Sequence, residues 1–243
     1  MFNIYMKGFY QNGSIVNTET LVQTIPASSE GELKLISPIV KGEMGNAEAF
    51  TFNIENGTQF YDAFRQMKTY IRVTYDGTNI FYGRVLTIED GFYGTRKIRC
   101  EGPLSFLLDS PIEGTEETDR KSVLVGRYLE TLITNHNTFL ENDPNRSFAL
   151  GNVPGNYNVS VSPDQQIENK SRKFGSDSWT DSKAAIEDLR SHYGGYLRAR
   201  LSGSIGSSIY LDWMNHYFNS SINTQTIEVG KNIIDLNTST EVD

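Results

Sequence analysis

Apolar and polar residues alternate along residues 69–101, and turn residues interrupt the alternation twice. A period of two places successive side chains on opposite faces of an extended chain, so the pattern predicts strands that each bury one face. The pair Asp76-Gly77 predicts a tight turn, because such turns need positive φ angles that glycine accepts readily. A second turn is expected from Asp90-Gly91 to Gly94. The stretch therefore predicts a three-stranded antiparallel meander.

Gly83 falls in the middle of the second of these strands. A glycine at such a point commonly marks a bulge or a bend, and a bend favours a sheet that curls into a small barrel. The same alternation predicts strands at residues 2–6 and 50–54. Pro103 can open a short helix that covers one end of the barrel. These patterns predict an α+β, β-rich fold with a small antiparallel β-barrel.

Helical spacing predicts a short helix at residues 58–67, where Thr58 is a suitable cap, and longer helices at residues 121–135 and 181–193. The longer helices lie after a polar, acidic run at residues 110–120, which is the best candidate for a domain boundary. We therefore expect a barrel domain at residues 1–111 and a mixed helix and sheet domain at residues 112–243. In the second domain, the pattern predicts strands at the following ranges: 196–201, 208–213 and 226–229, with short strands near Phe148 and Val159.

Composition excludes several classes of function. Lys and Arg number 22 against 30 Asp and Glu, which gives a formal charge of −8 and disfavours tight binding to nucleic acid phosphates. The sequence begins without the apolar core of a signal peptide and contains no apolar run of membrane-spanning length. We therefore expect folding in the cytoplasm and no membrane insertion. Cys100 lies in an alternating run and is interpreted as a small core side chain.

Catalytic and metal-binding motifs are missing from the sequence. The three histidines, His136, His192 and His216, are isolated, and a zinc site ordinarily needs three or four ligands in recognisable local pairs. There is no nucleophile elbow and no phosphate-binding glycine loop. The acidic residues near the domain boundary lack calcium-loop spacing and are interpreted as a solvated linker. We therefore predict no catalytic, cofactor-binding or metal-binding residues and no cofactor. A carboxylate pair for glycan hydrolysis stays open, because only distance in space defines it.

Residues 67–110 carry a longer and more specific pattern. It comprises an MKT start, the Asp76-Gly77 turn, the FYGR unit at residues 81–84, the DGFYG turn at residues 90–94 and CEGPLSFLLDS at residues 100–110. This pattern resembles the amino-terminal region of the tail-hub family, also described as tail-associated lysin or endopeptidase tail proteins, of phages and prophages of Gram-positive bacteria. Weaker echoes follow in order: LITNHN at residues 132–137, GGYLRAR at residues 194–200 and IEVGKNIIDL at residues 227–236.

The resemblance implies a structural protein of the tail tip or baseplate hub, expressed late and found at the tip of the virion tail after assembly in the host cytoplasm. Hub proteins of this kind form homotrimeric rings in which each copy supplies two related tail-tube-like barrels, so that a threefold ring matches a hexameric tube. The implied partners are the distal tail protein or the tail tube protein, and beyond these the tape measure and the spike or receptor-binding proteins. DNA is implied only as passing cargo.

Family chains usually continue past an NIIDL-like stretch into a second barrel, whereas this sequence stops at Asp243. The expectation is either a short version or an amino-terminal fragment, with any lytic activity outside these residues. Two alternatives stay open: a cell-wall-degrading endopeptidase or glycosidase, and a carbohydrate- or receptor-binding module. The positions that carry the family signature are expected to be structural: Asp76, Gly77, Gly83, Arg84, Gly91, Gly94, Cys100 and Gly102.

Overall fold

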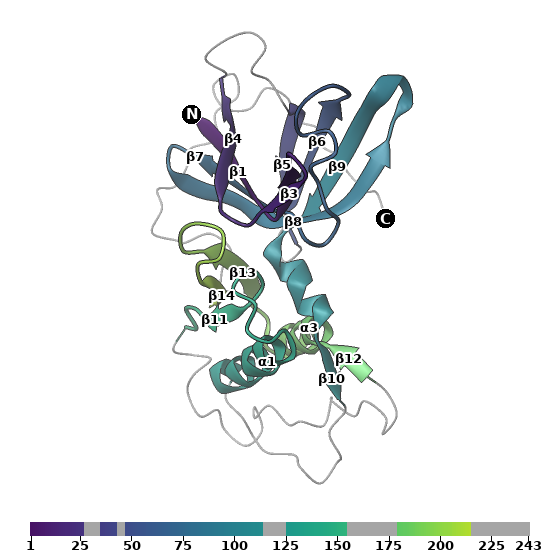
Figure 1. Ribbon diagram of the computed structural model, residues 1–243. Coiled ribbons are helices and arrows are strands. Elements are labelled where there is room, and N and C mark those ends of the chain that lie inside the picture. Colours follow the sequence, from purple (N-terminus) through teal and green to yellow (C-terminus); the bar gives the residue numbers. More distant parts are fainter. Residues whose placement is uncertain (27–34, 43–46, 114–124, 155–178, 215–243) are drawn as a thin grey trace, which may run out of the picture.

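The computed structural model describes residues 1–26, 35–42, 47–113, 125–154 and 179–214 (Figure 1). The predicted strands near Val159 and at residues 226–229, and His216, lie outside these ranges. The strands of the amino-terminal part are β1 Phe2–Lys7, β2 Phe9–Gln11, β3 Ser14–Val16, β4 Thr20–Ile25, β5 Ile36–Lys41, β6 Ala49–Glu55, β7 Tyr70–Tyr75, β8 Thr78–Asp90 and β9 Thr95–Glu101. The later elements are η1 Phe92–Gly94, η2 Pro103–Asp109, β10 Pro111–Glu113, α1 Val125–Phe139, β11 Phe148–Leu150, β12 Trp179–Asp181, α3 Ser182–Tyr193, β13 Tyr196–Leu201 and β14 Ile209–Met214.

Seven of the strands form one curled antiparallel sheet in the order β4-β1-β7-β8-β9-β6-β5. Figure 1 shows two wings, β4-β1-β7 and β9-β6-β5, that diverge from β8. The long strand β8 joins them because Thr78 to Arg84 pair with β7, whereas Arg84 to Asp90 pair with β9. The predicted meander and its Asp76-Gly77 turn are therefore confirmed.

The predicted closed barrel is wrong for the described residues, because no main-chain ladder joins the edge strands β4 and β5. The side-chain amide of Gln23 in β4 connects the two edges instead. It accepts a hydrogen bond from the Leu35 N–H at 2.7 Å and donates one to the Leu35 carbonyl oxygen at 3.3 Å. Beyond this contact, Pro38 provides no N–H, and the pairing of β5 with β6 shifts register between Ile36 and Ile39. The sheet is consequently a half-barrel whose two edges are connected by the hydrogen bonds of the Gln23 side chain.

The bend in β8 does not fall on the glycine that suggested it. Gly83 pairs regularly with Ile71, and the register shifts lie on either side, between Val73 and Thr74 of β7 and between Val85 and Thr87 of β8. An extra residue in one strand increases the local twist, so the two shifts together explain how β8 belongs to both wings.

The concave face of the sheet holds one hydrophobic cluster, which includes Phe50, Phe52, Phe81 and Cys100. The segment predicted as a helix at residues 58–67 closes this cluster as a series of turns, with Phe60 and Phe64 buried. No helix forms there, because main-chain groups bond to other partners: the Ala63 carbonyl oxygen accepts from the Tyr10 N–H of β2, and the Arg65 N–H donates to the Thr69 hydroxyl.

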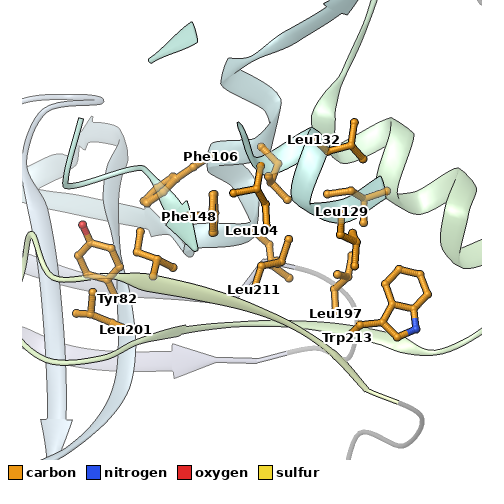
Figure 2. Close-up of a cluster of buried hydrophobic side chains, with 14 of the residues drawn as sticks. Tyr82, Leu104, Phe106, Leu129, Leu132, Phe148, Leu197, Leu201, Leu211 and Trp213 are labelled. Carbon is orange, nitrogen blue, oxygen red and sulfur yellow. The ribbon is translucent and has the colours of Figure 1, made fainter. Parts of the chain in front are cut away.

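A second hydrophobic cluster lies between the sheet and the carboxy-terminal elements (Figure 2). Tyr82 and Phe106 come from β8 and η2, whereas Leu129, Leu197 and Trp213 come from α1, β13 and β14. The three-stranded sheet β11-β14-β13 forms one wall of this cluster, and α1 and α3 cover it. The predicted hairpin at residues 196–201 and 208–213 is confirmed within one residue. The cluster contains residues from both sides of position 111, and the two-domain division stays a prediction.

Both longer helices are observed with small shifts. The first begins at Val125 among the described residues and ends at Phe139, four residues beyond its predicted end. In α3, Asp181 is the N-cap, because its Oδ1 accepts a hydrogen bond from the Ala184 N–H at 2.7 Å. The helix ends at Gly194, as predicted, where the φ angle is +66° and the N–H donates to the Arg190 carbonyl oxygen. None of the helices in the described ranges is long and apolar enough to span a membrane.

Candidate functional site

The predicted signature positions gather along the β7-β8-β9 meander. Asp76 and Gly77 have φ angles of +46° and +80°, which suit a two-residue turn between β7 and β8. At the other end of β8, the Gly91 N–H donates to the Thr95 carbonyl oxygen at 2.7 Å. Gly94, with φ +71°, accepts from the Asn56 N–H at 2.8 Å. These four positions shape the two turns of the meander.

Two further glycines allow backbones to approach closely. A Cβ atom on Gly83 would lie 2.0 Å from the carbonyl oxygen of Glu101, and one on Gly102 would lie 2.9 Å from the main-chain nitrogen and oxygen of Glu48. Cys100 is fully buried in the concave cluster, and burial raises the pKa of its thiol well above the usual value. It is therefore a core residue, as predicted, with no reactive thiolate at neutral pH.

Arg84 is the charged signature position, and it lies almost completely buried between the sheet and η2, with 3% of its side chain exposed. Its Nε donates to Glu101 Oε1 at 2.7 Å, and its two terminal nitrogens bind both carboxylate oxygens of Asp109, with Nη2 to Oδ1 at 2.9 Å. The guanidinium also lies over the Phe106 ring, 5.0 Å from its centroid. This bidentate geometry fixes the end of η2 relative to the sheet.

The network continues into the carboxy-terminal part. Asp109 also accepts from Arg146 Nη1 at 3.2 Å, and Arg146 Nε donates to Asp143 Oδ2 at 2.8 Å. Tyr82 adds a direct link, because its hydroxyl donates to the Asn145 carbonyl oxygen at 2.6 Å. We call Arg84, Glu101, Asp109, Asp143 and Arg146 the joint.

The ionisation of the joint follows from these contacts. Burial lowers the pKa of Arg84, but the hydrogen bonds and charges of Asp109 and Glu101 outweigh it, so the pKa lies above the usual value. Burial raises the pKa of Asp143, and hydrogen bonds from Asn145 and Arg146 more than offset this, so the pKa lies below the usual value. Both groups are therefore charged at neutral pH, and they act as fixed ion-pair partners.

A serine and histidine contact lies next to the joint. The Ser110 hydroxyl lies 2.7 Å from His136 Nδ1 and 2.6 Å from the Ser182 hydroxyl. His136 Nε2 lies 3.2 Å from the Arg146 carbonyl oxygen. Burial lowers the pKa of His136, which therefore stays neutral at pH 7. All three side chains are at most 1% exposed, so this contact ties η2, α1 and α3 together and offers no nucleophile to a substrate.

Sequence reasoning missed the partners of Arg84 and the role of His136. Asp109 and Ser110 were available in the motif at residues 100–110, but their partners Arg146 and His136 lie 37 and 26 residues away in the chain. An arginine on a strand face otherwise occupied by apolar residues was the available signal, because a buried charge requires a partner. Within the described ranges, no group of three His, Cys, Asp or Glu could hold a metal ion.

The outer surface of the sheet offers the most accessible candidate contacts. Leu21 on β4 is 51% exposed and Ile39 on β5 is 48% exposed, so each edge strand carries an accessible apolar side chain. At the tip of the β8-β9 hairpin, Phe92 is 89% exposed. Edge strands present main-chain groups that can pair with another chain. Within the described residues, these positions combine exposed apolar side chains with sheet edges that no main-chain ladder covers.

Comparison with known proteins identifies the fold. No protein-family model and no curated protein matches the chain. The structure is similar to the prophage tail protein gp18 from Listeria monocytogenes EGD-e, with a TM-score of 0.52 and 12% identity over 86% of this chain and 50% of that one. The fold is therefore that of a prophage tail protein.

Two further tail proteins have lower TM-scores. The tail protein from Neisseria meningitidis MC58 has a TM-score of 0.45 and 13% identity, over 86% of this chain and 50% of that one. The 43 kDa tail protein of prophage MuSo2 from Shewanella oneidensis has a TM-score of 0.44 and 13% identity, over 87% and 54%. The chain spans about half the length of each of the three solved proteins.

Proposed function

We propose that the protein is a structural component of a bacteriophage or prophage tail. The observation that carries this proposal is the tail-protein fold, which covers 86% of the chain. The motif at residues 67–110 supports it independently, since it resembles tail-hub proteins and forms the meander at the centre of the fold.

Within the tail, we propose a hub at the tip or baseplate. Three copies would form a ring that joins the distal tail protein or tail tube to a spike or receptor-binding end. The edges of the half-barrel favour this arrangement. Among the described residues, β4 and β5 have no strand partner on their outer sides apart from the contact of Gln23 with Leu35, and such edge strands can pair with a neighbouring chain. The joint favours it as well. A buried ion pair holds η2 on the sheet and a partly buried one connects η2 to Arg146, which suits a part that transmits load without changing shape.

The enzymatic and sugar-binding alternatives receive less support. The described serine and histidine pair is closed to solvent, and the largest buried aromatic rings, including Phe50, Phe52, Phe81 and Phe106, pack in the two hydrophobic clusters. A carbohydrate platform needs accessible rings beside a groove. Incubation of the protein with cell walls, followed by detection of released fragments, tests the lytic alternative directly.

Deletion of the encoding gene from its phage or prophage tests the tail role. We expect particles without complete tails, restored by the wild-type gene and visible by electron microscopy. The hub proposal is tested separately by native mass spectrometry, in which we expect trimers that Leu21→Lys and Ile39→Lys abolish. Phe139→Lys is the matched control, because Phe139 is 56% exposed on α1, away from both edges. Normal tails after deletion would refute the tail role, and wild-type protein that stays monomeric with its neighbours would refute the hub.

A further inference from the structure

A cleft of about 260 Å³ lies between the half-barrel and the carboxy-terminal sheet. Its walls are residues 79–82 of β8 and residues 198–201 of β13, with Glu48 and Pro103 beside them. The volume falls just below the roughly 300–1,000 Å³ typical of small-molecule sites. Four consecutive residues from each of two strands line the cleft, which indicates that strand edges form its walls.

The register of β13 identifies which main-chain groups face the cleft. Among the described residues, β13 is the last strand of its sheet, and Arg198 lies opposite Asp212 on β14. The Ser202 N–H donates to the Ser208 carbonyl oxygen at 2.9 Å. Hydrogen-bonded pairs alternate with non-hydrogen-bonded pairs along an antiparallel ladder. The main-chain groups of residues 198 and 200 therefore also bond to β14, whereas the main-chain N–H and carbonyl groups of residues 197, 199 and 201 point away from β14.

Two other observations agree with this assignment. The outward carbonyl oxygen of Leu201 accepts a hydrogen bond from Asn79 Nδ2 of β8 at 3.1 Å. On the opposite edge of β14, the Leu211 carbonyl oxygen accepts from Gly151, and the Trp213 N–H donates to Asn152. The N–H and carbonyl oxygen of Ala199 are therefore directed into the cleft, and Asn79 closes one end of it.

The opposite wall is also a strand edge. Residues 79–82 of β8 pair with β7, whereas pairing with β9 begins at Arg84. Among the described residues, the β9 side of this half of β8 therefore has no partner strand. An extended chain that enters the cleft meets a main-chain edge on each side.

The charged side chains of the cleft indicate which kind of extended segment it would bind. Arg198 and Arg200 are 49% and 46% exposed, and both pair with the single carboxylate of Asp212, which is 1% exposed. Two cations against the Asp212 carboxylate leave one positive charge at the mouth of the cleft, in a chain whose formal charge is −8. Glu48 also lines the cleft, but burial raises its pKa to about 7, so it offsets this charge fully only above pH 7. The Arg200 guanidinium also lies 4.6 Å from the Tyr210 ring centroid, which holds it in place.

We propose that this cleft is a docking site for an extended, acidic segment of a partner protein. The segment adds to the outward edge of β13 by main-chain hydrogen bonds at Ala199, and its carboxylate pairs with Arg198 and Arg200. Addition of a strand to an open edge is a common mode of peptide recognition, in which main-chain bonds supply affinity and side chains supply specificity. The proposal does not depend on the tail role, because binding is measured on the isolated chain.

Peptide titration followed by nuclear magnetic resonance tests the proposal. The probes are acetyl-Thr-Val-Glu-Val-Thr-amide and the same peptide with Gln or Lys in place of Glu. We expect the Glu peptide to shift the amide signals of Ala199 and Tyr82, and the Gln peptide to bind about 10-fold more weakly, because it loses a charge-assisted hydrogen bond. The Lys peptide should not bind. Equal binding of the Glu and Gln peptides, or no binding of either, overturns the proposal.

Variants test the main-chain hydrogen bonds and the ion pairs separately. Ala199→Pro removes the outward N–H while leaving the β13-β14 ladder its donors, so we expect it to abolish binding. Arg200→Gln should weaken binding of the Glu peptide about 10-fold. Arg99→Gln is the matched control, since it removes an exposed arginine from β9, and it should leave binding unchanged. Unaltered binding to folded Arg200→Gln protein also overturns the proposal.

Discussion

Replacement of Arg84 by Met should cost the protein a large part of its stability. The guanidinium makes three charge-assisted hydrogen bonds to Glu101 and Asp109. Met matches the length of the arginine stem but leaves both carboxylates without this partner. Breaking one side of a buried ion pair typically costs about 3–5 kcal/mol. Asp109 keeps Arg146 at 3.2 Å, and the two carboxylates are 14–15% exposed, so we expect a loss of about 3 kcal/mol, at the lower end.

Urea denaturation at pH 7 measures this loss, with tryptophan fluorescence, to which the buried Trp213 contributes, and far-ultraviolet circular dichroism as two probes. Arg84→Lys should lose about 2 kcal/mol, because a lysine cannot reproduce the bidentate contact. Arg99→Gln on β9 is the control and should change the free energy of unfolding by less than about 0.5 kcal/mol. A loss below about 1 kcal/mol for Arg84→Met would show that the joint does not hold the sheet and η2 together.

Three further variants test separate features. Gly83→Ala should destabilise the fold by about 3 kcal/mol or more in urea denaturation, because its Cβ would lie 2.0 Å from a carbonyl oxygen, whereas Gly42→Ala, with its nearest atom at 3.9 Å, should be tolerated. Burial raises the pKa of Glu48 from 4.5 to about 7, so ionisation of Glu48 destabilises the folded state above pH 7 and has no effect below pH 4.5. Glu48→Gln should therefore raise the free energy of unfolding by up to about 3 kcal/mol at pH 8 and hardly at pH 4, whereas the control Glu89→Gln, at an exposed position, should show no such difference between the two pH values. Burial lowers the pKa of His136 from 6.5, so stability should fall as pH drops below 6.5, and a His136→Gln variant with the same slope as the wild type would contradict this reasoning.

Local patterns in the sequence were sufficient for the central meander. The turn at Asp76 and Gly77 needs only positive φ angles, and the burial of Phe50, Phe52 and Cys100 follows from strict alternation. The hairpin of β13 and β14 and the end of α3 at Gly194 were predictable for the same reason. Each of these features depends on residues that lie close together in the chain.

Features that depend on distant residues were decided by the tertiary structure. The segment at residues 58–67 has a helical pattern, but its main-chain groups form isolated turns and bond to β2 and Thr69 instead of continuing as a helix. The barrel stays open because Gln23 and Leu35 replace a ladder with side-chain hydrogen bonds, which no periodicity encodes. Arg84 was visible in the sequence as a signature position. Only the fold brings Asp109 and Arg146 to it, because a buried charge takes its partner from any element that packs nearby.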